Sequence, residues 1–165
     1  MAENTAGEVE RMVVERIFDA PRELLWKAYT NPEYVQQWWG PNGFTSPSCR
    51  SDFRVGGKFL YCMRTPDGQD FWTGGEFHEI VPHEKIVFSM YFADEHGNKI
   101  SPEQLGIEHE AIDGARDVVL FEDLDEGRSK ITLIGNEPME NARTSGQLEG
   151  TEQMLDKLAV VLSHL

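Results

Sequence analysis

The feature that most constrains this chain is its final segment, residues 143–165, RTSGQLEGTEQMLDKLAVVLSHL. Apolar and small residues recur there at steps of three and four, which places them along one side of a single α-helix. The stripe consists of Leu148, Thr151, Leu155, Leu158, Leu162 and Leu165, and is widened by Met154, Ala159 and Val161. Polar residues fall mostly on the opposite side: Glu149, Glu152, Asp156 and Lys157. A helix this apolar on one side needs a partner surface, and most of the preceding chain has the pattern of strands.

Length and composition favour one globular domain, expected over residues 9–165, with residues 1–8 as a disordered N-terminus. The chain has 165 residues, of which 39% are hydrophobic, enough for a core. Its formal net charge of −14 argues against nucleic acid as a partner, because phosphate neutralisation requires Lys and Arg. The same charge argues against binding to anionic membrane surfaces.

Several features indicate a cytoplasmic protein. No apolar run reaches the ~20 residues of a membrane span. The first eight residues have neither the basic flank nor the apolar segment of a signal peptide. Cys49 and Cys62 are the two cysteines, too few for a disulfide framework and spaced unlike a zinc motif.

The N-terminal half predicts a strand followed by two short helices. Residues 9–18 carry β-branched residues in alternation and form the first predicted strand. Pro21 suits the first position of a helix, with Glu23 near its positive end. Asn31 is an expected cap for a second helix, which begins at Pro32 and ends near residue 38.

Further strands are predicted at residues 51–55, 58–64, 71–81, 86–92, 115–124 and 129–136. Pro66-Asp67-Gly68 has the composition of a turn. The pair at 56–57 indicates a bulge or a close backbone approach, and the pair at 74–75 indicates a second bulge. Residues 93–114 form an acidic insertion, in which residues 101–104 fit a capped helical turn. Short turns between successive strands predict an antiparallel sheet. The expected fold is α+β: about seven strands curled around the C-terminal helix, with either a packed core or a cavity between them.

Several motifs in order along the chain resemble one known family. They are FDAP (18–21) with WKA (26–28), QWWGP (37–41), DFRVGG (52–57), MRTPDG (63–68), and EIVP (79–82) with EKIVF (84–88). These are similar to the Activator of Hsp90 ATPase homologue 1-like family of the START/Bet v 1-like superfamily, also called SRPBCC. The resemblance covers about residues 10–92 and 115–165 and implies a helix-grip fold. Its members include co-chaperone domains and ligand carriers, so it does not fix a function.

The chain departs from the family pattern at two places. The family commonly has Gly-Trp midway in the last helix, whereas here Thr151 follows Gly150. If that Trp fills space under the sheet, Thr151 leaves a larger and slightly polar hole. The insertion at 93–114 also exceeds the usual connection. Both departures lie where a ligand or a lid could be specified, with neutral drift as the alternative.

No catalytic or metal-binding motif stands out. The Gly-x-Ser-x-Gly elbow, the phosphate-binding loop and the dinucleotide fingerprint are all missing from the sequence. Residues 109–113 lack the final His of a His-Glu-x-x-His motif. His78 and His83 are an odd number of residues apart, so a regular strand points them to opposite faces. Neither a metal nor another cofactor is expected.

A pocket between the predicted sheet and helix would be lined mainly by aromatic and apolar residues. The predicted ligand-binding residues are Trp39, Phe59, Tyr61, Met63, Phe77, Phe88, Met90, Arg116, Thr151, Leu155 and Leu158. The alternative for this set is a filled core. Arg54, Glu79 and His109 join Arg116 as possible polar partners of a ligand, or else belong to surface pairs.

Three functions follow from this pattern. The first is non-catalytic binding of a small, largely hydrophobic molecule. The second, implied by the resemblance, is a protein-interaction module that contacts an Hsp90-type chaperone. The third is an enzyme similar to polyketide cyclases, which requires at least two titratable groups, such as Glu79, His109 and Arg116, to converge inside the cavity. Either a monomer or a homodimer is compatible with the sequence.

Overall fold

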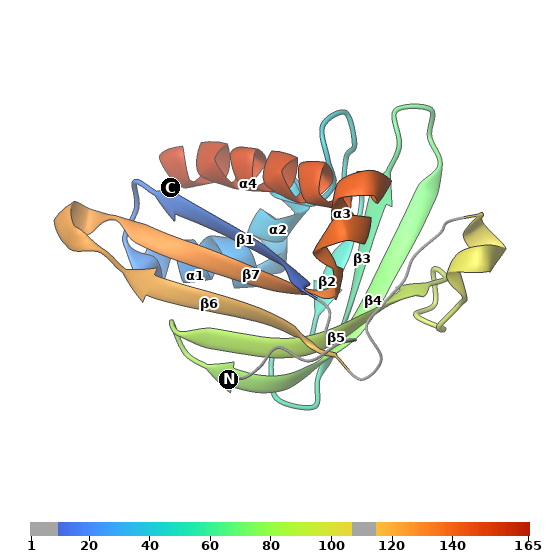
Figure 1. Ribbon diagram of the computed structural model, residues 1–165, viewed down its shortest axis with the longest axis horizontal. Coiled ribbons are helices and arrows are strands. Elements are labelled where there is room, and N and C mark those ends of the chain that lie inside the picture. The colour runs from blue at the N-terminus through green and yellow to red at the C-terminus, as the bar shows by residue number, and fades with distance from the viewer. Residues whose placement is uncertain (1–9, 107–114) are drawn as a thin grey trace.

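A curved antiparallel sheet with helices on its concave side makes up the described part of the chain, residues 10–106 and 115–165 of this computed structural model (Figure 1). The seven strands found there are β1 (Arg11–Phe18), β2 (Cys49–Ser51), β3 (Lys58–Arg64), β4 (Asp70–Val81), β5 (Lys85–Ala93), β6 (Asp117–Asp123) and β7 (Ser129–Pro138). Their order is β1-β7-β6-β5-β4-β3-β2, and each pair of neighbours is antiparallel.

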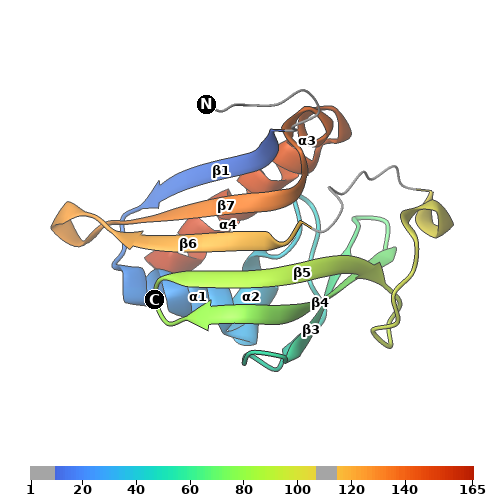
Figure 2. The same cartoon turned by 60° about the horizontal axis from the view of Figure 1, so that its bottom comes forward.

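The α-helices lie along the concave side of this sheet. They are α1 (Arg22–Thr30), α2 (Pro32–Trp38), α3 (Met139–Ser145) and α4 (Gln147–Ser163), with short 3-10 turns at η1 (Pro102–Leu105) and η2 (Asp125–Gly127). Figures 1 and 2 show α1, α2 and α4 together on one side of the sheet, with α4 running beside β1 and β7. The predicted α+β helix-grip arrangement is confirmed.

Local chemistry explains the two short helices. The Asn31 side chain accepts a hydrogen bond from the Glu33 backbone N–H at 3.0 Å, as expected of a cap before Pro32. The indole Nε1 of buried Trp38 donates to the Ala28 carbonyl at 2.9 Å. This bond fixes α2 against α1, so the two helices form one unit on the sheet.

The predicted C-terminal helix is broken in two. The prediction of a continuous helix from Arg143 is wrong, because Gly146 has φ 89° and ψ 0°. This left-handed conformation suits glycine and ends α3 at Ser145. The stripe on α4 is largely confirmed: Leu155, Leu158, Val161 and Leu162 are buried. Ala159 and Leu165, however, are exposed.

Two details of the strand predictions are also wrong. The short strand expected at residues 51–55 ends at Ser51, and the chain then turns back so tightly that a Cβ on Gly57 would lie 1.9 Å from the Asp52 carbonyl oxygen. Gly74 and Gly75 are not bulged, since they pair in register with Tyr91 and Met90. The irregularity in β4 lies between residues 77 and 79 instead.

The predicted strand at residues 9–18 is β1, with buried Met12 and Val14, although Ile17 is 52% exposed. The capped turn predicted in the insertion is η1, where Gln104 Oε1 accepts from the Ser101 backbone N–H at 2.9 Å. The expectation for residues 1–8 and the remainder of the insertion, 107–114, lie outside the described residues. No helix in the described ranges is long and apolar enough to cross a membrane.

Candidate ligand cavity

A cavity of about 700 Å³ lies between the concave face of the sheet and the helices. Its lining comes from β1, β3, β4, β5, β6 and β7, from α1, α2 and α4, and from the loops at residues 39–44 and 99–102. The lining is mostly aromatic and aliphatic. The space between the sheet and the helices is therefore not completely filled by side chains.

Aromatic rings form the wall contributed by β3, β4 and β5. The Phe59 ring centroid lies 4.9 Å from that of Tyr61, 5.2 Å from Phe77 and 5.9 Å from Phe88. Gly75 makes room for this group, because a Cβ there would lie 2.2 Å from the Phe59 ring. These ring pairs hold one another in place, so the wall is rigid without filling the space in front of it.

Trp39 closes the cavity on the helix side. Its ring packs edge-on against Tyr61 at 5.1 Å, whereas neighbouring Trp38 is buried in the core. Trp39 Nε1 is buried and makes no hydrogen bond within the described chain. It is thus a donor left open beside the cavity.

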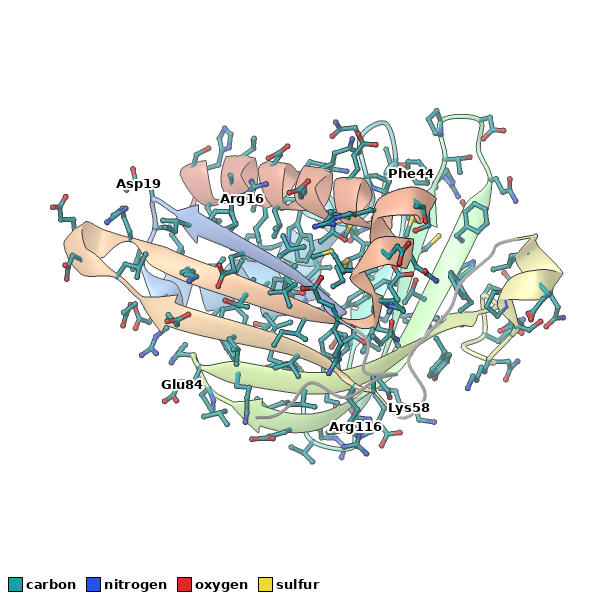
Figure 3. All side chains as sticks on the ribbon, in the orientation of Figure 1. Arg16, Asp19, Phe44, Lys58, Glu84 and Arg116 are labelled. Atoms are coloured by element: carbon teal, nitrogen blue, oxygen red, sulfur yellow. The ribbon has the colours of Figure 1, made fainter. Side chains whose placement is uncertain are left out.

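The loop after α2 is tied to α4 by one lysine. Lys157 Nζ donates to the carbonyl oxygens of Gly40 at 2.8 Å, Phe44 at 3.3 Å and Pro41 at 3.4 Å. Pro41 and Phe44 line the cavity, and Figure 3 shows Phe44 near the junction of α3 and α4. Burial lowers the pKa of Lys157. The ammonium therefore holds one side of the cavity together.

Two buried carboxyl groups line the sheet side of the cavity. Asp117 in β6 is 8% exposed and Glu137 in β7 is 3% exposed. Burial raises the pKa of Asp117 to about 7, the Arg11 guanidinium opposes this shift, and Glu137 adds to it. Burial also raises the pKa of Glu137. Carboxyl groups with these shifts mark a candidate functional site.

Tyr29 of α1 belongs to the same group of side chains. Burial raises the pKa of its phenol, and the charges of Tyr61 and Asp117 raise it further. Arg11 approaches from β1, but the hydrogen bonds it makes within the described chain go to main-chain carbonyls. Its Nε donates to Gly135 O at 2.8 Å and its Nη2 to Arg116 O.

Nine of the eleven predicted site residues line the cavity: Trp39, Phe59, Tyr61, Met63, Phe77, Phe88, Met90, Thr151 and Leu155. Leu158 is fully buried in the core outside the lining. Arg116 is exposed, lies directly before the start of β6, and is on the side of the view away from α4 (Figure 3). The fold thus gathers most of the predicted residues around one cavity.

The polar residues predicted from sequence are not those the cavity contains. Arg54 is exposed and pairs with Asp52 at 2.9 Å, and Glu79 is exposed and pairs with Lys85 at 2.9 Å. His109 lies outside the described residues. The set predicted for catalysis is therefore not assembled by the described part of the chain.

Asp117 was not among the predicted site residues, although the sequence around it contains a signal for its inward direction. Asp117, Val119 and Phe121 alternate along the predicted strand at 115–124, and all three are buried on one face. That alternation points Asp117 inward with its apolar neighbours. Within the described ranges, no three His, Cys, Asp or Glu residues are grouped as ligands for a metal ion.

A second depression, of about 510 Å³, lies near the start of α1 at the β4–β5 and β6–β7 ends of the sheet. Its lining is largely charged and includes Arg22, Glu84, Lys85 and Asp123. Arg22 Nε lies 3.4 Å from Asp123 Oδ2, so two of these charges already face each other. It has no aromatic wall comparable with that of the larger cavity.

Comparison with known proteins agrees with this architecture. A family model described as Activator of Hsp90 ATPase homolog 1-like protein matches residues 19–163. A solution structure from Arthrobacter aurescens has 27% identity and a TM-score of 0.74, covering 98% of this chain and 94% of that one. The AHSA1 protein from Silicibacter pomeroyi has 23% identity and a TM-score of 0.67, covering 92% and 96%. A crystal structure from Rhodobacter sphaeroides has 18% identity and a TM-score of 0.75, covering 96% and 95%. No match was found among curated proteins.

Proposed function

Since this chain belongs to the family of Activator of Hsp90 ATPase homolog 1-like proteins, we propose that it binds a small, mostly apolar molecule between its sheet and α4. The observation that carries the proposal is the cavity of about 700 Å³ under the aromatic wall. Ligand sites of this kind span roughly 300–1,000 Å³ and combine an apolar lining with a few polar groups. Trp39 Nε1 and Asp117 Oδ1 are two such groups, since both are buried without a hydrogen bond in the described chain.

Thr151 supports the proposal from the helix side. It lines the cavity, and its Oγ1 donates to the Gln147 carbonyl at 2.8 Å. The hydroxyl is thus paired within its own helix, leaving the methyl group for the cavity. The family's usual Trp at this position would add a large ring to the same space. If that Trp fills space under the sheet in the family, Thr151 leaves more room in the cavity than a Trp would.

A dye-binding experiment with cavity-filling variants tests the proposal. N-Phenyl-1-naphthylamine, a neutral dye that fluoresces in apolar surroundings, is titrated against the wild type, Thr151→Trp and Ala159→Trp. Ala159 is exposed on the same helix, so its variant adds the same side chain outside the cavity. We expect saturable binding to the wild type and Ala159→Trp, and affinity weaker by about tenfold or more for Thr151→Trp. Absence of saturable binding, or equal binding by all three proteins, contradicts the proposal.

A chaperone-interaction role is the second candidate. The family match over residues 19–163 and the net charge of −14 favour it, because an acidic surface complements a basic patch on a partner. The test is the steady-state ATPase rate of an Hsp90-type chaperone with and without this protein. A salt-sensitive rise in that rate supports the role, and an unchanged rate at saturating protein contradicts it.

A further inference from the structure

One row of side chains across the sheet joins the aromatic wall to a carboxyl group. In the register of the strands, Phe77 of β4 lies opposite Phe88 of β5, and Phe88 lies opposite Asp117 of β6. Residues directly opposite one another project from the same face of a sheet. All three line the cavity. An apolar molecule lying against Phe77 and Phe88 therefore reaches Asp117 at its end.

One carboxyl oxygen of Asp117 is buried without a hydrogen bond in the described part of the chain. Its side chain lines the cavity at 8% exposure, and Oδ1 receives no hydrogen bond from residues 10–106 or 115–165. The nearby guanidinium of Arg11 donates to the main-chain carbonyls of Gly135 and Arg116 instead. Buried acceptors are rarely left open, so Oδ1 points to a donor supplied from elsewhere.

The charges around Asp117 favour a cation as that donor. Among the described residues, the Arg11 guanidinium favours the ionised form of Asp117 and the nearby carboxyl group of Glu137 disfavours it, so a cationic donor at the open Oδ1 would stabilise the ionised form of Asp117. Phe88 beside Asp117 offers an aromatic face, to which cations are also attracted. A ligand carboxylate at this place would meet two acids and be repelled.

We propose that the molecule held in the cavity carries an amine at one end, with the protonated nitrogen bound at Asp117 Oδ1 and the apolar body against Phe77 and Phe88. This inference rests on the proposed binding function and narrows its ligand to the class of amphiphilic amines. A neutral hydroxyl can donate to the same oxygen but lacks the electrostatic attraction to the carboxylate, so a ligand with a hydroxyl binds more weakly. The net charge of −14 adds a long-range attraction for such a cation.

Three probes of one shape separate the possibilities. They are 2-(1-naphthyl)ethylamine, 2-(1-naphthyl)ethanol and 1-naphthylacetic acid, titrated by calorimetry against the wild type, Asp117→Asn and Asp123→Asn. Asp123 is exposed at the other end of the same strand, so its variant removes the same charge far from the cavity. Charge-assisted hydrogen bonds predict that the wild type and Asp123→Asn bind the amine about 10–100 times more tightly than the alcohol. The acid should bind most weakly.

In Asp117→Asn the preference for the amine over the alcohol should disappear, while affinity for the alcohol stays within about threefold of that of the wild type. A second measurement on the wild type does not depend on this variant folding. The amine preference should fall between about pH 8 and pH 5.5, as the carboxyl group takes up a proton. Groups facing Asp117 are Arg11 from β1, Glu137 from β7 and Tyr29 from α1, and Phe88 from β5 carries no charge. Glu137 also gains a proton as the pH falls. If the amine preference no longer changes with pH in Asp117→Asn, the pH dependence in the wild type is due to Asp117.

The outcomes distinguish the inference from the proposal beneath it. Equal wild-type affinity for amine and alcohol, or an amine preference that survives in Asp117→Asn, overturns the amine ligand and leaves a cavity that binds apolar molecules. Failure of all three probes to bind the wild type overturns both. Tighter binding of the acid than of the amine likewise overturns the amine ligand and leaves a cavity that binds apolar molecules.

Discussion

The carboxyl group of Asp117 makes the stability of the protein depend on pH. Its pKa is raised to about 7 by burial, so the folded state keeps a proton that the unfolded state loses near pH 4. Because the folded state then binds more protons, the free energy of unfolding falls as pH rises from about 4 to about 7. Above the folded pKa this loss is complete.

Asp117→Asn should therefore be more stable than the wild type at about pH 8, by an amount on the order of 1–3 kcal/mol. The advantage should shrink as the pH is lowered toward about 4.5, since the wild-type carboxyl group is then protonated in the fold. Urea unfolding at several pH values measures the difference. Glu122→Gln, on an exposed position of β6, is the control. A difference between Asp117→Asn and wild type that does not change with pH would contradict the argument.

Lys157 contributes through three main-chain acceptors at once. Lys157→Met keeps the length of the side chain but leaves the carbonyls of Gly40, Pro41 and Phe44 without the ammonium donor. We expect a loss of about 1–3 kcal/mol in the free energy of unfolding. The matched control is Lys130→Met, since Lys130 makes a surface ion pair with Glu15 at 3.0 Å, worth about 0–1 kcal/mol. Similar losses in the two variants would show that the loop contact adds nothing.

Single residues were predictable where their signal was local. Strand alternation placed Phe59, Tyr61 and Phe88 on the inward face, and they line the cavity. Arg116 does not line the cavity, and the sequence could not show this, because the direction of a charged side chain beside a strand is unknown until the strand is seen to begin at Asp117. Glu137 lies at the end of β7, past the predicted strand, so its inward direction depended on a pairing with β1 that no local pattern contains.

Among the helices, the break between α3 and α4 gives two glycines opposite roles. Gly146 has φ 89°, a conformation in which a Cβ is strained, whereas Gly150 lies within α4. A Cβ on Gly150 would lie 3.6 Å from Pro41, an ordinary contact. Both positions have room for a Cβ, so they differ in backbone conformation and not in steric hindrance.

Alanine substitutions should consequently change stability in opposite directions. Gly146→Ala should lower the free energy of unfolding by about 1–2 kcal/mol, since the residue must remain left-handed. Gly150→Ala should raise it by about 0.5–1 kcal/mol, because alanine favours a helix interior. Thermal and urea unfolding of both variants measure this. A stabilising Gly146→Ala would indicate that α3 and α4 can join into one helix.

Element boundaries were predictable where capping and turn residues set them. Asn31-Pro32 and Ser101-Pro102 mark their helical turns as the sequence indicated. The strand expected at 51–55 failed because the approach of Gly57 to Asp52 is a contact between backbone atoms, which side-chain alternation cannot report. The break at Gly146 lies before Leu148, the first residue of the apolar stripe, so the spacing held no signal of it.

Across the entire chain, charge should govern how fast a cationic ligand enters. With a net charge of −14, the association rate of 2-(1-naphthyl)ethylamine should fall several-fold between about 20 mM and about 300 mM NaCl. The rate for the alcohol of the same shape should stay nearly constant. Stopped-flow fluorescence measures both. Equal salt dependence for the two probes would exclude electrostatic attraction as the cause.

The class of fold could be predicted from the series of strands with short turns before one amphipathic helix. The order of the strands in the sheet could not be predicted in this way. That β1 pairs with β7, joining residues 11–18 to residues 129–138, is a long-range pairing with no local signature. The size of the cavity likewise depends on how far the sheet bends over α4. These properties arise from packing between distant segments.

The same pairing has a consequence for synthesis on the ribosome. β1 is translated more than a hundred residues before β7, its neighbour in the sheet, and before α4, which packs against it. Until then the nascent chain contains an incomplete sheet with an exposed hydrophobic face, and such a state is prone to aggregation with other chains. Completion is therefore expected only after translation of residues 147–163, and slowly, because contacts so far apart in sequence close large loops.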